Sequence, residues 1–380
     1  MNYNVFRLIL LEDNEEYALK EDIVNAEIKN ILVIRLSSIG DVLKCTVVID
    51  MLRERYPQAN ITWLVETKSK GVLIGNSKLD EVIVWERKEW SRQARQTRNY
   101  LRFAQQLWNF VKKIRVRNFD LVIDLQGLPR SGLVSFFSGA PYRISYDKAR
   151  KRSHMWANIR VTPDRKLDKT VMRHYAGLLR GLGIDSDKLQ MQMPILHEDE
   201  VFAQQFMDKN HLTISRFIII NPATSWKSKC WPSSYYAEIA DRIIETYDIP
   251  ILLTGGPTDT NLIQEIISKM HNQAINACGQ TTLRQLAAII KKSLLFISGD
   301  TGSLFIAEAV GTPTLSMFGP TDPDWHAPQG AQHVALSTHL CNCEKSYCEN
   351  PVCLTKLSPE IVWEEFVKLA NRLGINKVSL

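Results

Sequence analysis

Short apolar runs alternate with longer amphipathic stretches from about residue 30 onward. Short, continuously apolar runs are typical of buried strands in a parallel sheet. In the first half of the chain the expected strands are residues 31–36, 61–65, 82–85 and 119–125. The expected helices are residues 42–56, which stop at Pro57, and a strongly basic segment at residues 97–115.

The alternation resumes after a less regular stretch near residues 190–213. The second set of expected strands is residues 216–221, 251–254, 294–298 and 314–318. The helices expected here are residues 233–247, 303–310 and 359–373. Strands that alternate with helices form parallel sheets through right-handed crossovers. The pattern therefore predicts an α/β protein with two doubly wound domains.

The chain length supports this division, because 380 residues exceed what one ordinary core accommodates. Four segments are expected along the chain. They are an N-terminal extension that forms a helix or arm (residues 1–28), a first domain (29–195), a second domain (213–357) and a C-terminal helix (358–380).

Composition and the N-terminal sequence favour a cytoplasmic protein. Hydrophobic residues make up 45% and charged residues 23%, as in ordinary soluble globular chains. No apolar run reaches the roughly 18 residues that a membrane span needs. Seven acidic residues lie between Glu12 and Glu27, whereas a secretory signal has a basic start and a longer apolar stretch.

The net charge of +6 is concentrated in two basic clusters. Between Arg87 and Arg117 there are ten lysines and arginines and one acidic residue, Glu89. The second cluster comprises Arg143, Lys148, Arg150, Lys151 and Arg152. Such clusters attract anions, which here include phosphates, acidic sugars, nucleic acid and an anionic membrane surface.

Four polar loops follow strands of the second half, at residues 221–230, 255–259, 299–303 and 319–323. Ligands of open parallel sheets bind outside the carboxyl ends of the strands. In the third loop, Asp300, Thr301, Gly302 and Ser303 join a strand to a helix. Free N–H groups and the helix dipole make such a turn a phosphate site. A tight turn with a helix cap explains the same residues, and is slightly favoured when they are considered alone.

Other residues of these loops have similarly open interpretations. Lys227 and Lys229 in the first loop are within reach of the same phosphates, although exposed lysines are usually only solvated. Asp259 is placed to accept hydrogen bonds from ribose hydroxyls or to cap a helix. Neither a G-x-G-x-x-G after the first strand nor a P-loop is present, so a standard NAD or ATP site is disfavoured.

Asp41 is the candidate catalytic residue of the first half. It lies in the loop after the first strand, next to Gly40. A carboxylate at a helix N-terminus is often only a cap. It also serves as a general base where it faces a cleft.

Four of the seven cysteines lie close together near the C-terminus. The odd total argues against a disulfide framework. Cys341, Cys343, Cys348 and Cys353 have a spacing that differs from the paired C-x-x-C of zinc ribbons. Two interpretations of these four cysteines stay open. They bind a zinc ion or an iron–sulfur cluster, or they are simple reduced or reactive thiols.

Four motifs together resemble glycosyltransferase family 9, the ADP-heptose:lipopolysaccharide heptosyltransferases. They are Ser37-Ser38-Ile39-Gly40-Asp41-Val42, Ile123-Asp124-Leu125-Gln126-Gly127-Leu128, Gly299-Asp300-Thr301-Gly302 and Phe318-Gly319-Pro320-Thr321-Asp322-Pro323. Each motif is short, but their order, spacing and positions at strand ends make the joint match specific. The resemblance covers roughly residues 30–370, and the first half is most similar to heptosyltransferase I.

The resemblance implies a GT-B fold, in which two Rossmann-like domains face a central cleft. It implies inverting transfer of heptose from ADP-heptose to Kdo-lipid A without a metal or other required cofactor. Asp41 matches the family's proposed base, and Lys229 matches a lysine that contacts the donor diphosphate. The resemblance also implies donor-binding roles for Asp300, Thr301, Gly302 and, by a looser match, Asp259. Ser303, Thr224 and Ser225 are further expected donor-binding residues. The expected acceptor-binding residues are Ser38, Gln126, Arg92, Arg95, Arg143, Arg150 and Lys151.

The expected partners are the nucleotide-sugar donor, the Kdo-lipid A acceptor and the anionic cytoplasmic face of the inner membrane, with no nucleic acid. Two features depart from heptosyltransferase I, namely the N-terminal extension and the cysteine cluster. Two alternatives stay open. One is an enzyme of the same fold with another nucleotide sugar or glycan acceptor, and the other is a basic, non-enzymatic protein that binds nucleic acid or membrane.

Overall fold

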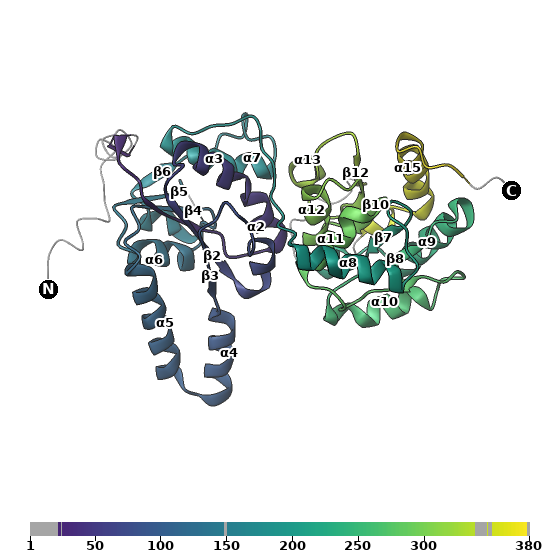
Figure 1. Ribbon diagram of the computed structural model, residues 1–380, viewed down its shortest axis with the longest axis horizontal. Coiled ribbons are helices and arrows are strands. Elements are labelled where there is room, and N and C mark those ends of the chain that lie inside the picture. Colours follow the sequence, from purple (N-terminus) through teal and green to yellow (C-terminus); the bar gives the residue numbers. More distant parts are fainter. Residues whose placement is uncertain (1–21, 24, 148–149, 339–347, 349–351, 378–380) are drawn as a thin grey trace. The chain divides into compact units, whose positions relative to one another are not determined.

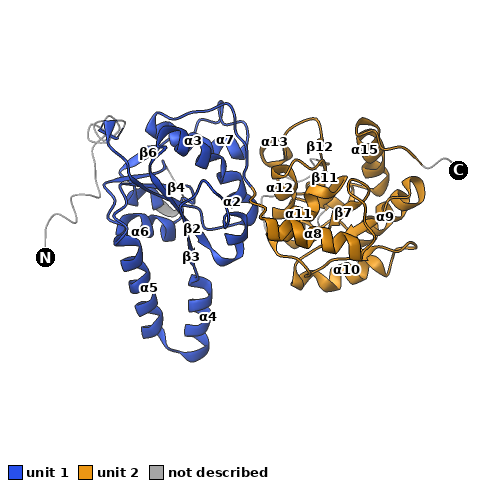
Figure 2. Ribbon diagram, viewed as in Figure 1, with its two compact units in different colours: residues 1–192 blue, residues 193–380 orange. Residues whose placement is uncertain are grey.

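The computed structural model describes residues 22–23, 25–147, 150–338, 348 and 352–377, and it divides into two compact units. Unit 1 comprises residues 1–192 and unit 2 residues 193–380 (Figure 2). Each unit has one sheet of six parallel strands with helices around it (Figure 1). None of the helices in the described part of the chain is long and apolar enough to cross a membrane.

The sheet of unit 1 has the order β3-β2-β1-β4-β5-β6. Its strands are β1 (Asn30–Ile34), β2 (Asn60–Glu66), β3 (Glu81–Trp85), β4 (Leu121–Asp124), β5 (Tyr142–Tyr146) and β6 (Ile159–Val161). Its α-helices are α2 (Ile39–Cys45), α3 (Val47–Arg55), α4 (Arg87–Thr97), α5 (Tyr100–Arg115), α6 (Pro129–Phe137) and α7 (Val171–Gly177). Its described residues also form the 3-10 helices η3 (Thr67–Val72), η4 (Arg150–Trp156) and η5 (Leu178–Leu182).

Unit 2 repeats the same strand order, since its sheet runs β12-β11-β10-β7-β8-β9. The strands are β7 (Ile218–Asn221), β8 (Ile251–Leu253), β9 (Ile275–Asn276), β10 (Leu295–Gly299), β11 (Thr314–Met317) and β12 (His333–Leu336). The α-helices are α8 (His197–Lys209), α9 (Ser233–Tyr247), α10 (Thr260–Ile267), α11 (Leu283–Lys292), α12 (Gly302–Ala309), α13 (Pro323–His326), α14 (Val352–Thr355) and α15 (Pro359–Arg372). The 3-10 helices are η6 (Lys227–Lys229) and η7 (Pro257–Asp259).

Each unit has its own apolar core beside its sheet. In unit 1, Trp85 of β3 stacks on Phe110 of α5 with ring centroids 5.0 Å apart. In unit 2, Trp231 and Tyr236 pack edge to face at 4.9 Å. Helix α8 belongs to unit 2, because its Glu198 and Asp199 pair with Arg284 of α11. The expected domain boundaries place α8 in neither domain, because the apolar pattern is less regular there.

Two helix predictions in unit 1 need correction. The helix expected at residues 42–56 is two helices that meet at Thr46. The Thr46 hydroxyl donates to the Leu43 carbonyl oxygen at 2.6 Å and accepts from the Gln192 N–H at 2.8 Å. Side-chain bonds of this kind compete with the helical ladder.

The basic helix expected at residues 97–115 begins only at Tyr100. Arg98 is left-handed (φ 54°), and the Asn99 side chain caps α5 by accepting from the Arg102 N–H at 3.0 Å. The preceding residues form α4, which the sequence analysis did not predict. Helices α4 and α5 form an antiparallel hairpin whose turn points away from the sheet (Figure 1).

The sequence analysis missed four strands, namely β5, β6, β9 and β12. They are short, and each belongs to the outer part of its sheet. The expected arm at residues 1–28 lies mostly outside the described residues.

Candidate active site

The loops after β1 and β4 meet where the strand order of unit 1 reverses, which is where α/β sheets bind ligands. Gln126 links them, because its side-chain carbonyl oxygen accepts from the N–H groups of Leu36 at 2.9 Å and Ser37 at 3.2 Å. The sequence analysis assigned Gln126 to the acceptor. In the structure its carbonyl oxygen fixes the position of the loop that leads to Asp41.

Asp41 lies in the first turn of α2, at the end of that loop. Its Oδ2 accepts from the Ser38 hydroxyl at 2.9 Å and from the Ser38 N–H at 3.3 Å, so it helps to cap the helix. Its Oδ1 accepts from the Tyr175 hydroxyl at 2.8 Å. One third of the side chain is nevertheless exposed (33%). The carboxylate is thus held on both oxygens and still accessible from outside.

Arg35 contacts both Asp41 and Tyr175. Its guanidinium lies 3.1 Å from Asp41 Oδ2 and donates to the Tyr175 hydroxyl at 2.9 Å and to the Leu125 carbonyl oxygen at 2.6 Å. The guanidinium also covers the Tyr175 ring at 4.6 Å. Arg35 and Tyr175 are both only 7% exposed.

Sequence reasoning assigned no role to Arg35 or Tyr175. A single arginine in an otherwise apolar strand was an available signal for Arg35, since buried charges are paired. Tyr175 carried no such local signal, because α7 lies far along the chain and reaches Asp41 only through the fold.

These contacts determine the charge state of Asp41. Burial by itself raises its pKa, but the charges of Arg35 and Lys44 and the hydrogen bonds from Tyr175 and Ser38 outweigh this and hold the pKa well below its usual range. The carboxylate is therefore ionised at neutral pH. It accepts a proton only from a group that becomes strongly acidic during reaction.

Asp124, at the end of β4, shapes the neighbouring loop. Its Oδ1 accepts from the N–H groups of Gln126 at 3.0 Å and Gly127 at 3.1 Å, and its Oδ2 accepts from the Ser131 hydroxyl at 2.9 Å. Burial raises the pKa of Asp124 to about 6, although these hydrogen bonds act to lower it. The Asp124-Leu125-Gln126-Gly127 motif thus builds the loop that positions Gln126.

A basic pocket lies on α4, the helix that follows β3. Its volume is about 360 Å³, and it is lined by Arg87, Lys88, Ser91, Arg92, Arg95 and Gln96. Arg87 and Lys88 pair with Glu66 at the end of β2, at 3.5 and 2.5 Å. Because the Glu66 N–H donates to the Leu36 carbonyl oxygen at 2.9 Å, the pocket begins beside the loop that carries Asp41. Arg92 and Arg95 are thus in a site suited to an anion.

Arg143 is not available for such a site. It is 8% exposed, and its guanidinium donates to the carbonyl oxygens of Ala140 at 2.6 Å and Trp156 at 3.1 Å. Burial lowers its pKa. We therefore remove Arg143 from the expected acceptor set. Arg150 and Lys151 lie in η4, and the structure does not describe their side chains.

In unit 2 the strand order reverses between β7 and β10. The loop after β7 contributes Lys229, whose Nζ lies 2.5 Å from Oδ2 of Asp300, the residue after β10. The same Oδ2 accepts from the Thr321 hydroxyl at 2.8 Å. Lys229 also lies over the Trp226 ring at 4.6 Å. An ammonium has three N–H donors, so Lys229 retains capacity for a further anion.

The turn after Asp300 leads directly into α12, whose N-cap is Thr301. The first N–H groups of an α-helix have no intrahelical partner, so those of Gly302 and Ser303 suit an anion. The Ser303 hydroxyl accepts from the Asn221 amide at 2.8 Å. A β-carbon at Gly299 would lie 3.1 Å from the Lys229 carbonyl oxygen, so glycine permits the two loops to approach closely.

Of the remaining expected donor residues, Thr224 lies beside this turn, 3.0 Å from the position of a β-carbon at Gly299. The Thr224 hydroxyl donates to the Trp226 carbonyl oxygen at 2.8 Å, and Ser225 is exposed. Asp259 caps its own loop, because its Oδ2 accepts from the Gly256 N–H at 2.8 Å. Its Oδ1 accepts a long hydrogen bond from the Thr258 hydroxyl at 3.4 Å, so both carboxylate oxygens have contacts within the loop.

Comparison with known proteins assigns this pair of sheets to a family. The model of glycosyltransferase family 9 (heptosyltransferase) matches residues 107–353. The chain belongs to glycosyltransferase family 9. The enzyme class expected from the sequence is thereby confirmed.

This family 9 protein has curated and solved relatives along most of its length. It is 24% identical to the lipopolysaccharide core heptosyltransferase OpsX of Haemophilus influenzae, over 90% of this chain and 92% of that one. A family 9 glycosyltransferase from Veillonella parvula superposes with a TM-score of 0.75 at 24% identity, covering 91% and 97% of the two chains. Escherichia coli heptosyltransferase WaaC with ADP superposes with a TM-score of 0.69 at 19% identity, covering 90% and 100%. The expected α/β class and GT-B fold are confirmed.

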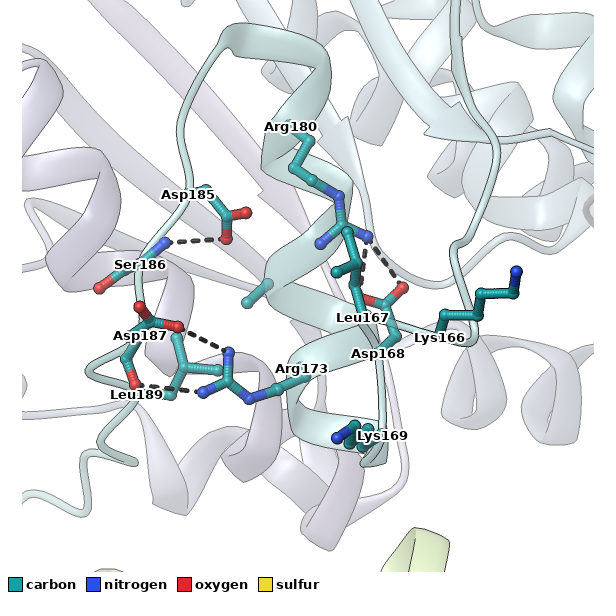
Figure 3. Close-up of a pocket in the computed structure, with 11 residues that line it drawn as sticks. Lys166, Leu167, Asp168, Lys169, Arg173, Arg180, Asp185, Ser186, Asp187 and Leu189 are labelled. Carbon is teal, nitrogen blue, oxygen red and sulfur yellow. Dashed lines mark hydrogen bonds and ion pairs between the residues drawn. The ribbon is translucent and has the colours of Figure 1, made fainter.

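A second cavity in unit 1 of the family 9 chain has a different character. It measures about 370 Å³ and lies among α7, η5 and the loops before and after them (Figure 3). Both of its arginines are paired, since Arg180 donates to both oxygens of Asp168 at 2.8 and 2.9 Å and Arg173 pairs with Asp187 at 3.4 Å. Each of these arginines therefore already has a carboxylate partner within the cavity lining.

The cysteine cluster is only partly within the described residues. Cys341 and Cys343 lie outside them, whereas Cys353 is buried in α14 at 2% exposure. Among the described residues, no group of three or more His, Cys, Asp or Glu side chains is arranged to hold a metal ion. The metal hypothesis for Cys341, Cys343, Cys348 and Cys353 stays a prediction.

Proposed function

We propose that this glycosyltransferase moves heptose from ADP-heptose to the Kdo-lipid A inner core of lipopolysaccharide, with inversion and without a metal. The observation that carries the proposal is the Asp41 carboxylate, held ionised by Arg35 and Tyr175 at the strand-order reversal and still one third exposed. Support for the substrates comes from the relatives, which include a lipopolysaccharide core heptosyltransferase and a heptosyltransferase with ADP.

The proposed reaction is a direct displacement. The oxygen of an acceptor hydroxyl forms a bond to the anomeric carbon of heptose, and the bond from that carbon to the diphosphate oxygen breaks. Its electron pair leaves with ADP. Asp41 takes the hydroxyl proton, which becomes strongly acidic as the new bond forms. A carboxylate with a depressed pKa is a weak base for the free hydroxyl, so proton transfer accompanies bond formation.

The leaving diphosphate is stabilised by unit 2 in this proposal. Lys229 and the first N–H groups of α12 supply positive charge where negative charge grows, which stabilises the transition state more than the ground state. Asp300 is itself an anion. Its contacts with Lys229 and Thr321 therefore favour a role in positioning the ammonium rather than in touching phosphate.

The acceptor is proposed to bind on unit 1. The α4 pocket supplies Arg92 and Arg95 for the carboxylates and phosphates of a Kdo-lipid A acceptor. Ser38 lies against Asp41, so a hydroxyl that reaches Asp41 also contacts Ser38. We further propose that the protein is cytoplasmic and acts at the cytoplasmic face of the inner membrane, and that residues 29–195 and 213–357 are the acceptor and donor domains.

Transfer of heptose from ADP-heptose to Kdo-lipid A by the full-length protein is the direct test. Asp41→Asn is expected to lower kcat by about 10²–10⁴-fold and to leave ADP affinity, measured by calorimetry, unchanged. Asp50→Asn in α3 is the matched control, because Asp50 is an exposed carboxylate paired with Lys78. Near-normal turnover of the Asp41→Asn variant would remove Asp41 from the mechanism.

Lys229→Ala tests the donor site separately. The substitution removes a charge-assisted contact to phosphate, which corresponds to about a 10–100-fold loss of affinity for ADP. Lys227→Ala, an exposed lysine two residues earlier, is the control. Unchanged ADP affinity of Lys229→Ala would refute the assignment. Release of nucleoside diphosphate from a panel of ADP- and UDP-sugars distinguishes heptose transfer from the alternative donors.

A further inference from the structure

The α4–α5 hairpin carries apolar side chains that its own unit does not bury. Tyr100, Leu101 and Trp108 are 63%, 85% and 59% exposed. Leu101 and Trp108 lie two helical turns apart on one face of α5, and Lys112 continues the same face. The opposite face packs into the core of unit 1 through Phe110 and Ile114. Helix α5 therefore has two apolar faces, and only one has a partner in unit 1.

Basic residues surround this second face. The segment from residue 87 to residue 117 has ten lysines and arginines and one acid, Glu89, which pairs with Arg92. Arg95, Arg98 and Arg102 lie at and beside the turn of the hairpin and are all exposed. Lys112 Nζ lies over the Trp108 ring at 5.5 Å. Exposed apolar and aromatic side chains between cations are typical of segments that lie in the interface of an anionic bilayer.

We propose that the tip of the α4–α5 hairpin, residues 95–108, inserts into the headgroup region of an anionic phospholipid bilayer. Leu101 and Trp108 enter the apolar boundary, and Arg98 and Arg102 contact lipid phosphates. The inference rests on the proposed function, because an acceptor built on lipid A resides in a bilayer. It adds the segment by which the enzyme reaches that acceptor.

The geometry of the hairpin agrees with this placement. Interfacial segments enter the bilayer by about 5–10 Å. Trp108 lies eight residues, or about 12 Å, after the start of α5, so Leu101 and Trp108 both reach the apolar boundary when their face of α5 lies along the bilayer surface. Helix α4 packs against α5, so the pocket that it carries lies close to that surface.

Two other occupants fit the surface less well. A second copy of the chain would bring the same positive charge to the contact, and like charges oppose association. Nucleic acid would satisfy the cations and stack on aromatic rings. It would leave Leu101, the most exposed large hydrophobic side chain among the described residues, without an apolar partner.

Co-sedimentation of the full-length protein with vesicles tests the proposal. Wild-type protein is expected to bind vesicles of phosphatidylcholine with about a third phosphatidylglycerol, and to bind pure phosphatidylcholine at least tenfold more weakly. The Leu101→Gln/Trp108→Gln variant is expected to lose at least tenfold in partitioning to the anionic vesicles. Ile361→Gln in α15, which is also an exposed aliphatic residue on a helix (44%), is the matched control and is expected to bind as wild type.

Activity measurements separate this proposal from the proposed function. The double variant is expected to keep wild-type transfer to a deacylated, water-soluble acceptor and to lose transfer to the same acceptor embedded in vesicles. Vesicle binding with these dependences but no heptose transfer in wild type would contradict the proposed function alone. Wild-type vesicle binding by the double variant, or binding to a DNA duplex but not to anionic vesicles, would overturn the hairpin proposal.

Discussion

Replacement of Tyr175 by phenylalanine isolates the hydroxyl that joins Arg35 to Asp41. The ring stays, so its contact with the Arg35 guanidinium at 4.6 Å is retained. Two hydrogen bonds to charged groups are lost, one from Arg35 at 2.9 Å and one to Asp41 at 2.8 Å. Each such bond contributes about 1.5–3 kcal/mol. Because Arg35 and Asp41 still contact each other, we expect a total loss of about 2–3 kcal/mol in the free energy of unfolding.

The same substitution acts on the reaction through Asp41. The Tyr175 hydrogen bond is one of the contacts that lower the Asp41 pKa, so its loss raises that pKa toward the ordinary carboxyl value. In the wild type the carboxylate stays ionised as the pH falls below neutral, and the acidic limb from Asp41 in kcat/KM lies far below neutral pH. In Tyr175→Phe the acidic limb is expected to shift to higher pH, while the charges of Arg35 and Lys44 still hold the Asp41 pKa below its usual range. Looser orientation of the carboxylate is expected to lower kcat by about tenfold at neutral pH.

The assay is the pH dependence of kcat and kcat/KM for heptose transfer, together with urea unfolding. Tyr146→Phe is the control. Tyr146 is also buried in unit 1, and its hydroxyl has no hydrogen-bond partner among the described residues. An unchanged kcat and pH profile in Tyr175→Phe, with only reduced stability, would refute the positioning role and leave the tyrosine as a structural residue.

Two further predictions concern the loops. The pKa of Asp124 is about 6 in the folded protein and 3.8 ordinarily, so the folded state favours the protonated carboxyl. The stability that this protonated carboxyl contributes is fully present below about pH 4 and is lost as the pH rises through 6. Asp124→Asn keeps an acceptor for the two N–H groups and a donor for Ser131, and is expected to raise the unfolding free energy by up to about 3 kcal/mol at pH 8 but not at pH 4. A pH-independent difference in urea titrations would contradict this. Gly299→Ala is expected to displace the Lys229 loop and weaken ADP binding about tenfold, because the new methyl lies 3.1 Å from a carbonyl oxygen. Calorimetry that shows wild-type affinity would exclude this close approach as a requirement.

Much of the fold follows from local sequence patterns. Buried parallel strands are continuous apolar runs, and eight of the twelve strands in the described part of the chain were expected close to their observed positions. Of the four missed strands, β9 and β12 are half-buried, so their apolar signal is weak. Strand β6 has only three residues, and polar residues interrupt the apolar pattern of β5. The helix break at Thr46 and the helix cap at Asn99 depend on side-chain hydrogen bonds, which the spacing of apolar residues does not predict.

The order of residues along the chain predicted an α/β fold, and the motif resemblance predicted the enzyme class, both of which are confirmed. Polar loops after apolar strands must collect at the carboxyl edge of a parallel sheet, so the sequence made Asp41, Lys229 and Asp300 candidates, and their roles stay predictions. How these residues are held depends on the packing of distant segments. Arg35 and Tyr175 contact Asp41 because the fold packs α7 against the loop that follows β1. Their contacts in this partly buried site keep the Asp41 carboxylate ionised.

The fold likewise sets which cations are available to a ligand. In the sequence, Arg143 and Arg95 belong to similar basic clusters, but the fold buries the first against main-chain carbonyl oxygens and leaves the second exposed on α4. The sequence shows which residues are charged, but the packing around each residue determines its exposure to solvent and its partners.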